Sequence, residues 1–204
     1  MMVDDMFSQL KKKKPIAKPR SVDQPCASEK IVFYKGTRIA TSSGWQKVED
    51  LQKGQSVRTA DNHEELIADL GHEALRFSAS RDTVRDWPVI LPAGAVGNAE
   101  KILVSPNLRL VIENPNAKSR NQPKRVSVRA ETLIGYRGIA RAPLYVDLEQ
   151  VAVSFSQAAT LILEGGVLTD VPSTSGDLAV PPLDDRASRA ILHKLRRADL
   201  RRSN

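Results

Sequence analysis

Two consecutive segments decide the fold of this 204-residue chain: Ile31-Val32-Phe33-Tyr34-Lys35-Gly36-Thr37-Arg38-Ile39-Ala40-Thr41-Ser42-Ser43-Gly44-Trp45 and Val48-Glu49-Asp50-Leu51-Gln52-Lys53-Gly54-Gln55-Ser56-Val57-Arg58-Thr59. Residues 37–41 and 55–59 alternate with a period of two, which is typical of strands with one buried face. Gly36 permits a sharp bend after the first apolar run. The turn Leu51-x-x-Gly54 can bring the two alternating runs together. These segments therefore predict short, paired β-strands.

Short apolar runs that end at turn residues continue through the rest of the chain. They occupy 101–104, 108–112, 126–128, 145–148, 151–155 and 160–163. Many short strands without a long helical pattern between them predict an all-β sandwich or barrel-like domain. The less regular segment 64–85 is compatible with a long hairpin extension, and 130–134 with a single helical turn. No internal repeat is visible.

The composition excludes several classes of protein. The single cysteine, Cys26, rules out an internal disulfide framework and a Cys-based zinc site within one chain. No run approaches the 18 apolar residues of a membrane-spanning helix. Residues 1–30 lack the apolar region of a signal peptide. We therefore expect no membrane span and no classical signal peptide, with a location in the cytoplasm or within an exported assembly.

The net charge of +7 lies at the two ends of the chain. Residues 1–30 hold seven basic and four acidic side chains, and residues 184–204 hold seven basic and three acidic ones. The body, 31–183, is balanced at 17 of each sign. A strongly basic chain suggests nucleic acid, but here the suggestion applies to the ends alone.

The two ends predict different structures. Residues 1–30 contain Lys11, Lys12, Lys13 and Lys14 and several prolines, so we expect a disordered basic leader. A compact β domain follows over 31–171, and then a Pro/Ser-rich linker over 172–183.

Residues 184–202 predict a basic amphipathic helix. Asp184-Asp185 would cap its first turn. Its apolar stripe is Ala187, Ile191, Leu195 and Ala198, and its C-terminal cations are Arg196, Arg197, Arg201 and Arg202. The stripe favours packing on the β domain, and a partner helix or an acidic surface is the alternative. Lys11–Lys14 and these four arginines are the candidate partner-binding residues.

Three blocks of the sequence resemble the Hint domain, the fold of Hedgehog autoprocessing domains and inteins, in its short bacterial form. The first block is 33–59, quoted above. The others are Val89-Ile90-Leu91-Pro92-Ala93-Gly94-Ala95-Val96-Gly97-Asn98 with Ile102-Leu103-Val104-Ser105-Pro106-Asn107-Leu108-Arg109-Leu110, and Thr160-Leu161-Ile162-Leu163-Glu164-Gly165. The order and spacing of the blocks carry the resemblance over about 31–171.

The resemblance implies self-processing chemistry whose residues are missing here. A working Hint domain attacks its own backbone with a Cys before the Phe, and a histidine protonates the departing nitrogen. The corresponding positions are Val32 and Leu108, and a further histidine position falls at Ala158. The scaffold residues Gly36, Thr37, Ser105, Pro106 and Arg109 are retained. The pattern predicts a Hint scaffold without catalytic residues, metal or cofactor.

Other candidate reactive residues fit less well. Cys26 lies six residues before Val32, and making it the nucleophile would displace the Gly36-Thr37 anchor. Thr37 has a structural place in its strand. A metal reading of His63 and His72 is weak, because their spacing is not that of a fixed ligand pair.

Two further functional interpretations have little support from the sequence. His193 occupies no family position, and Asn204 is separated from the β domain by the linker and helix, so a splicing reading has no support. A basic loop, Lys118, Arg120, Lys124, Arg125 and Arg129, has no aromatic stacking platform.

Three functional hypotheses follow from these residues. The first is a catalytically inactive structural or interaction module that contacts other protein subunits through its tails. The second is residual self-processing through Cys26 or a hydroxyl. The third is electrostatic binding of nucleic acid through the tails.

Overall fold

The computed structural model describes residues 31–76, 84, 87–117, 122–142 and 147–202. The predicted leader, with Lys11–Lys14 and Cys26, lies outside these residues. The described chain is built from short strands with two single-turn helices and one longer helix near the C-terminus. This all-β architecture with a C-terminal helix confirms the predicted fold class.

The strands and helices follow one another in a simple order. The strands are β1 (Ile31–Tyr34), β2 (Arg38–Thr41), β3 (Gly44–Lys47), β4 (Ser56–Arg58), β5 (Glu64–Arg76), β6 (Val89–Leu91), β7 (Ile102–Val104), β8 (Arg109–Glu113), β9 (Arg125–Arg129), β10 (Ala140–Arg141), β11 (Asp147–Phe155), β12 (Ala159–Leu163) and β13 (Val167–Val171). The helices are η1 (Val48–Asp50), η3 (Ala130–Leu133) and α1 (Asp185–Arg202).

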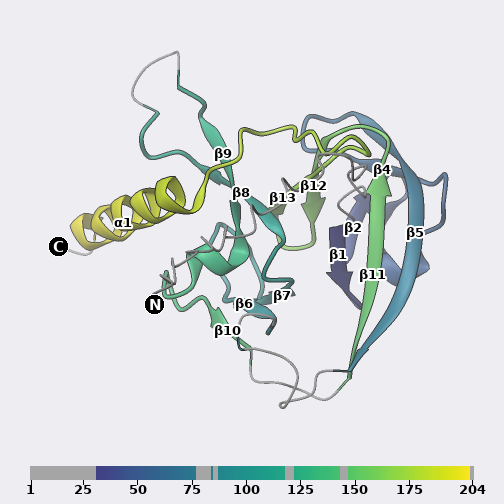
Figure 1. The fold of residues 1–204 in the computed structure, drawn as a ribbon, viewed down its shortest axis with the longest axis horizontal. Helices are drawn as coiled ribbons and strands as arrows, with labels where there is room; N and C mark the ends of the chain where they lie inside the picture. Colours follow the sequence, from purple (N-terminus) through teal and green to yellow (C-terminus); the bar gives the residue numbers. More distant parts are fainter. Residues whose placement is uncertain (1–30, 77–83, 85–86, 118–121, 143–146, 203–204) are drawn as a thin grey trace, which may run out of the picture.

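One large curved sheet carries most of these strands. Its order is β1-β11-β5-β4-β2-β12-β13-β8-β9, with β3 added beside β2, and a small sheet pairs β10-β6-β7. Figure 1 shows β5 and β11 running side by side along one end of the molecule, with β8, β9 and α1 toward the other. The sheet order therefore makes β1 and β9 its two terminal strands.

The structure corrects the interpretation of 64–85 as a hairpin extension. The described part, β5, is one strand that pairs with its neighbour β4 on one side and with the distant strand β11 on the other, where Leu70 lies opposite Val153. The pairing with β11 joins segments far apart in the sequence, so no local turn signals it. Residues 145–148 and 151–155 had each predicted a strand, and their described residues belong to the single strand β11.

Four strands were not predicted from the sequence: β3, β6, β10 and β13. β3 follows the turn at Ser42-Ser43 and pairs back on β2. β13 follows Gly165-Gly166 and pairs with β12 along its whole length. The predicted helical turn at 130–134 is present as η3, and the predicted helix at 184–202 as α1.

The core lies where the alternating faces of the strands meet. Phe33, Ile39, Val57, Ile67 and Phe155 are almost fully buried. Of these, Ile39 and Val57 occupy inward positions of the alternating runs 37–41 and 55–59. Removing such side chains from water is the main source of stability for a fold of this kind.

Gly36 joins β1 to β2 in a left-handed conformation, with φ of 87°. Its N–H donates to Glu49 Oε2 at 2.8 Å, and the Thr37 N–H donates to the Tyr34 carbonyl at 3.1 Å. An L side chain rarely adopts this φ. The bend predicted at Gly36 is therefore present, and it sends the chain from β1 into β2.

The candidate functional site

Two of the three degenerate family positions share one cavity. It has a volume of about 200 Å³, and its lining residues are Ile31, Val32, Ser105, Asn107, Leu108, Arg109 and Pro172. The chain segments that meet here are β1, the turn before β8 and the end of β13. The structure thus brings Val32 and Leu108 together, as their family positions imply.

Backbone hydrogen bonds fix the turn that carries Leu108. The Leu108 N–H donates to the Ser105 carbonyl at 3.0 Å. Two donors at the start of η3 hold the same turn: the Ala130 N–H bonds the Leu108 carbonyl at 2.9 Å and the Glu131 N–H bonds the Pro106 carbonyl at 3.0 Å. The retained residues Ser105 and Pro106 therefore shape a turn whose histidine position holds a buried leucine.

The lining of the cavity offers one hydroxyl and no base. Ser105 is the one side chain among these seven with an oxygen nucleophile. A serine hydroxyl needs an adjacent proton acceptor to become reactive. The neighbouring lining side chains are alkyl groups, a proline ring, an amide and a guanidinium, and none of these takes a proton at neutral pH. The described lining thus lacks a paired nucleophile and base.

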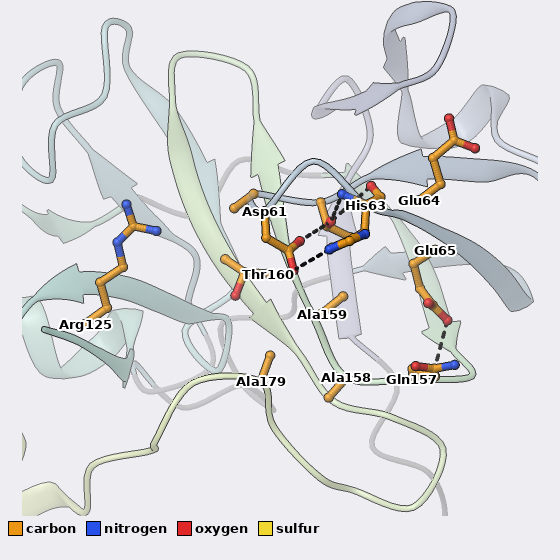
Figure 2. A pocket seen from close by; sticks show the side chains of 12 residues that line it. Asp61, His63, Glu64, Glu65, Arg125, Gln157, Ala158, Ala159, Thr160 and Ala179 are labelled. Carbon is orange, nitrogen blue, oxygen red and sulfur yellow. Dashed lines mark hydrogen bonds and ion pairs between the residues drawn. The ribbon is translucent and has the colours of Figure 1, made fainter. Parts of the chain in front are cut away.

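The third degenerate position, Ala158, lies in a different pocket. This pocket has a volume of about 480 Å³ and is lined mainly by the β4–β5 turn and the β11–β12 connection. Figure 2 shows Ala158 and Gln157 on one side and Asp61, His63 and Glu65 opposite. The Gln157 N–H donates to Glu65 Oε1 at 3.1 Å. Ala158 is therefore not assembled with Val32 and Leu108.

The Asp61–His63 contact at this pocket is solvated. His63 Nε2 lies 3.8 Å from Asp61 Oδ2, and both side chains are more than 70% exposed. The Thr59 hydroxyl hydrogen-bonds the Asp61 carboxylate and lowers its pKa. The same hydroxyl donates to the His63 carbonyl at 3.0 Å and accepts from the His63 backbone N–H at 3.1 Å, so its contacts with His63 are to the backbone and not to the imidazole. The arrangement supports a polar turn and no catalytic triad.

The three histidines lie apart from one another. His63 lies on the β4–β5 turn, His72 is exposed on β5 opposite Val151, and His193 is exposed on α1. Within the described ranges, no three His, Cys, Asp or Glu side chains form a group suited to a metal ion.

A buried carboxylate that the sequence did not reveal lies on β13. Asp170 is fully buried, and the antiparallel register next to the Thr169–Leu110 pair places it opposite Arg109. The Ala179 N–H donates to Asp170 Oδ1 at 3.2 Å. Burial raises the pKa of Asp170, and nearby Ser127, backbone N–H groups and Arg109 offset part of the rise.

Three polar atoms around this carboxylate lack a hydrogen-bond partner among the described residues. They are Asp170 Oδ2, Ser127 Oγ and Arg109 Nη1. Ser127 is close enough to influence the carboxyl, although the two oxygens are not in hydrogen-bonding geometry. The retained family residue Arg109 thus lies between the cavity and this buried cluster.

The predicted partner-binding arginines occupy one end of the molecule. Arg196 donates from Nη2 to the Ile134 carbonyl at 3.4 Å, whereas Arg197 and Arg201 are exposed. Arg202 is the last residue of α1. Of the basic loop, Lys124, Arg125 and Arg129 are described and exposed.

Asp199, which lies on the inner side of α1, anchors the helix to the body. Its two carboxylate oxygens accept from Arg137 Nε at 2.7 Å and Arg137 Nη2 at 2.5 Å.

No helix within the described ranges has the length and apolar composition needed to cross a bilayer.

Comparison with solved structures finds inteins and an intein-like domain. An MchDnaB-1 intein is 11% identical at a TM-score of 0.42, covering 68% of this chain and 99% of that one. The Msm DnaB1 intein splicing domain, solved bound with zinc, is 12% identical at 0.41, covering 67% and 97%. A bacterial intein-like domain from Clostridium thermocellum is 13% identical at 0.41, covering 69% and 98%. Comparison with curated proteins gives no match.

The family assignment rests on a model of the Hint domain, which matches residues 31–169. The matched range begins at β1 and ends within β13, so it includes every residue that lines the cavity of Val32 and Leu108 except Pro172. It spans more than half of the sequence. The chain therefore belongs to the Hint domain family.

Proposed function

We propose that this Hint domain does not process itself and serves as a structural and interaction module. The observation that carries the proposal is the pairing of two alkyl side chains, Val32 and Leu108, in the cavity where the family places its nucleophile and its acid. A valine side chain has no lone pair with which to form an ester or thioester. A leucine side chain cannot donate a proton to a departing amide.

The contacts of the module are made by its basic ends. The domain body is neutral, and the excess positive charge lies in residues 1–30 and 184–204. α1 is held on the domain by buried side chains and by the Arg137–Asp199 pair. A rigid domain that holds a cationic helix in place is suited to presenting it to another molecule.

Intact-mass measurement of the purified full-length chain tests this proposal. We expect the mass to stay at 22.4 kDa, with and without dithiothreitol. A fragment produced by cleavage beside residue 32 would contradict the proposal, because it would require a nucleophile and an acid that the cavity lining lacks.

The second candidate function is residual self-processing through Cys26, the one thiol of the chain. It predicts a fragment in the wild-type chain that disappears in Cys26→Ala. A fragment that persists in Cys26→Ala would assign the cleavage to a hydroxyl instead, and Ser105→Ala would then test the hydroxyl in the cavity.

A further inference from the structure

α1 has an inner face that packs against the domain. Ser188, Ile191 and Leu192 are buried, and Leu195 packs against the main core. Figure 1 shows the helix beside β9 at one end of the molecule, with its C-terminal end pointing away from the sheet. The predicted apolar stripe therefore packs on the domain through Ile191 and Leu195, whereas Ala198 is exposed.

The opposite face of α1 carries a row of four arginines and one histidine. At about 100° per residue, one arc of roughly 120° carries five basic side chains and no acidic one. They are Arg186, Arg189, His193, Arg197 and Arg201. All five are exposed, and within the described residues none has a hydrogen bond or ion pair. We call these five residues the outer row.

The outer row is about 22 Å long at 1.5 Å per residue, with steps of about 5 Å. Stabilisation of the helix does not explain every basic residue of the outer row. Cations near the C-terminus favour the helix dipole, which accounts for Arg197 and Arg201. Arg186 lies in the first turn, where a positive charge opposes the dipole, and Arg189 lies beyond the reach of either helix end.

The arginines of the outer row favour a partner that carries a series of anionic oxygen groups. Arginine presents a planar fork of donors that matches phosphate and carboxylate groups. Protein interfaces are depleted of charge at their centre, and the exposed face offers Leu200 as its one large apolar side chain. Interfacial membrane helices insert an apolar face, and here that face is buried in the domain.

The absence of aromatic side chains on α1 narrows the choice of partner further. α1 contains no Phe, Tyr or Trp. Proteins that bind single strands stack bases on such rings. Interfaces with duplex nucleic acid are strongly positive and draw much of their affinity from the phosphate backbone. The row therefore fits a duplex better than a single strand, an acidic protein or a lipid surface.

We propose that the outer row of α1 binds the phosphate backbone of duplex nucleic acid without reading its sequence. The inference rests on the proposed interaction role of the helix and names its partner. Each arginine that contacts a phosphate displaces condensed cations, so the affinity falls as salt rises.

Fluorescence anisotropy of the full-length protein with a labelled DNA duplex of about 20 base pairs tests the proposal between about 50 and 200 mM salt. We expect binding that weakens linearly on a logarithmic salt scale. The triple variant R189Q/R197Q/R201Q should weaken binding at low salt by at least about tenfold and make the slope shallower by about 3. Two duplexes of unrelated sequence should bind within about twofold of each other.

Two control variants separate the helix from net charge and from helix loss. K47Q/K53Q/R58Q removes the same charge from exposed side chains on the β3–β5 side of the domain and should leave the slope unchanged. R189K/R197K/R201K keeps the charge and should retain most of the slope. Glutamine is a good helix former, and circular dichroism of each variant checks that α1 is intact.

Three results would overturn the proposal. One is no binding of the duplex at the lowest salt. The second is equal loss of binding in R189Q/R197Q/R201Q and K47Q/K53Q/R58Q. The third is binding to anionic phosphatidylserine vesicles or polyglutamate, but not DNA, that depends on the outer row. Intact mass of the same sample separates the two proposals, since cleavage contradicts the inactive scaffold and an intact chain that ignores DNA contradicts only the duplex partner.

Discussion

Asp170 shows how a single buried side chain can set the pH response of the fold. Its carboxyl is fully buried, and its pKa is raised above the ordinary 3.8 mainly by burial. A raised pKa in the folded state means that the protonated form is the better accommodated one. Its contribution to stability is therefore complete below pH 3.8 and is lost as the pH rises through the folded-state pKa.

Asp170→Asn replaces the buried carboxyl with a neutral group of the same shape. We expect the variant to have a larger free energy of unfolding than the wild type at neutral pH, and the gain to shrink as the pH falls toward 3.8. Urea denaturation across this range measures the difference. Asp50→Asn, at an exposed carboxylate, is the control. A variant that is less stable at neutral pH would show that attraction to Arg109 outweighs burial.

Asn98 holds together the loop between β6 and β7. Its buried side-chain amide donates to the carbonyls of Pro92 at 2.8 Å and Glu100 at 2.6 Å, and its Oδ1 accepts from the Val96 N–H at 3.1 Å. These bonds satisfy three backbone groups that the loop conformation leaves without strand partners.

Asn98→Ala should lower the free energy of unfolding by about 2–4 kcal/mol, because those backbone groups lose their partners. Urea denaturation followed by circular dichroism measures the loss. Asn107→Ala provides a matched control, since Asn107 is exposed at the rim of the cavity. A loss below about 0.5 kcal/mol for Asn98→Ala would show that water replaces the amide without cost.

At the scale of elements, α1 is fixed to the domain by apolar packing and by one two-point ion pair. The Arg137 guanidinium pairs with Asp199 and lies 5.2 Å from the centre of the Tyr136 ring. Asp199 raises the pKa of Arg137, which keeps the guanidinium charged. Arg137 itself has a φ of 44°, an uncommon conformation for a residue other than glycine.

A double-mutant cycle with Arg137→Ala and Asp199→Ala measures how much this pair stabilises the fold. We expect a coupling free energy of about 0.5–1 kcal/mol, because the pair is partly exposed and screened by water. Arg38→Ala with Glu164→Ala, a more exposed pair 3.1 Å apart, gives the comparison and should show a smaller coupling. Equal couplings for both pairs would show that the two-point geometry adds nothing.

Across the whole molecule, local sequence signals predicted some features of the structure and missed others. Local signals predicted the strands around Gly36 and the capped helix, because period, turn residues and caps lie within a few positions of one another. The family resemblance singled out Val32, Leu108 and Ala158, but the cavity that Val32 and Leu108 line came from the structure. Asp170 gave no signal, because its burial depends on residues 179–183 crossing beside β9, a contact between separated segments.

The strap formed by residues 172–184 makes the folded unit longer than the family match. Ser127 on β9 donates its N–H to the Pro181 carbonyl at 3.0 Å, and the Leu183 N–H donates to the Ser127 carbonyl at 2.9 Å. These bonds cover the outer edge of β9, a terminal strand of the large sheet. Open strand edges promote association between chains.

A chain that ends at residue 171 should therefore associate, because it uncovers the edge of β9 and the apolar surface under Leu192. Light scattering after size-exclusion chromatography compares it with the full chain. Asp185→Stop, which keeps the strap and omits α1, separates the two causes. A monomeric, fully folded product ending at residue 171 would contradict a structural role for the strap.

The alkyl lining of the cavity has a consequence for the two cationic ends. The described chain begins at β1, and α1 follows the strap beside β9, at the other end of the strand order. A self-cleaving domain would release its leader, whereas an uncut chain keeps both ends tethered to one body. Engagement of one end then raises the effective concentration of the other at the same surface. Under the proposed function, the uncut chain would therefore act as a bivalent protein, whereas a self-cleaving one would separate from its leader.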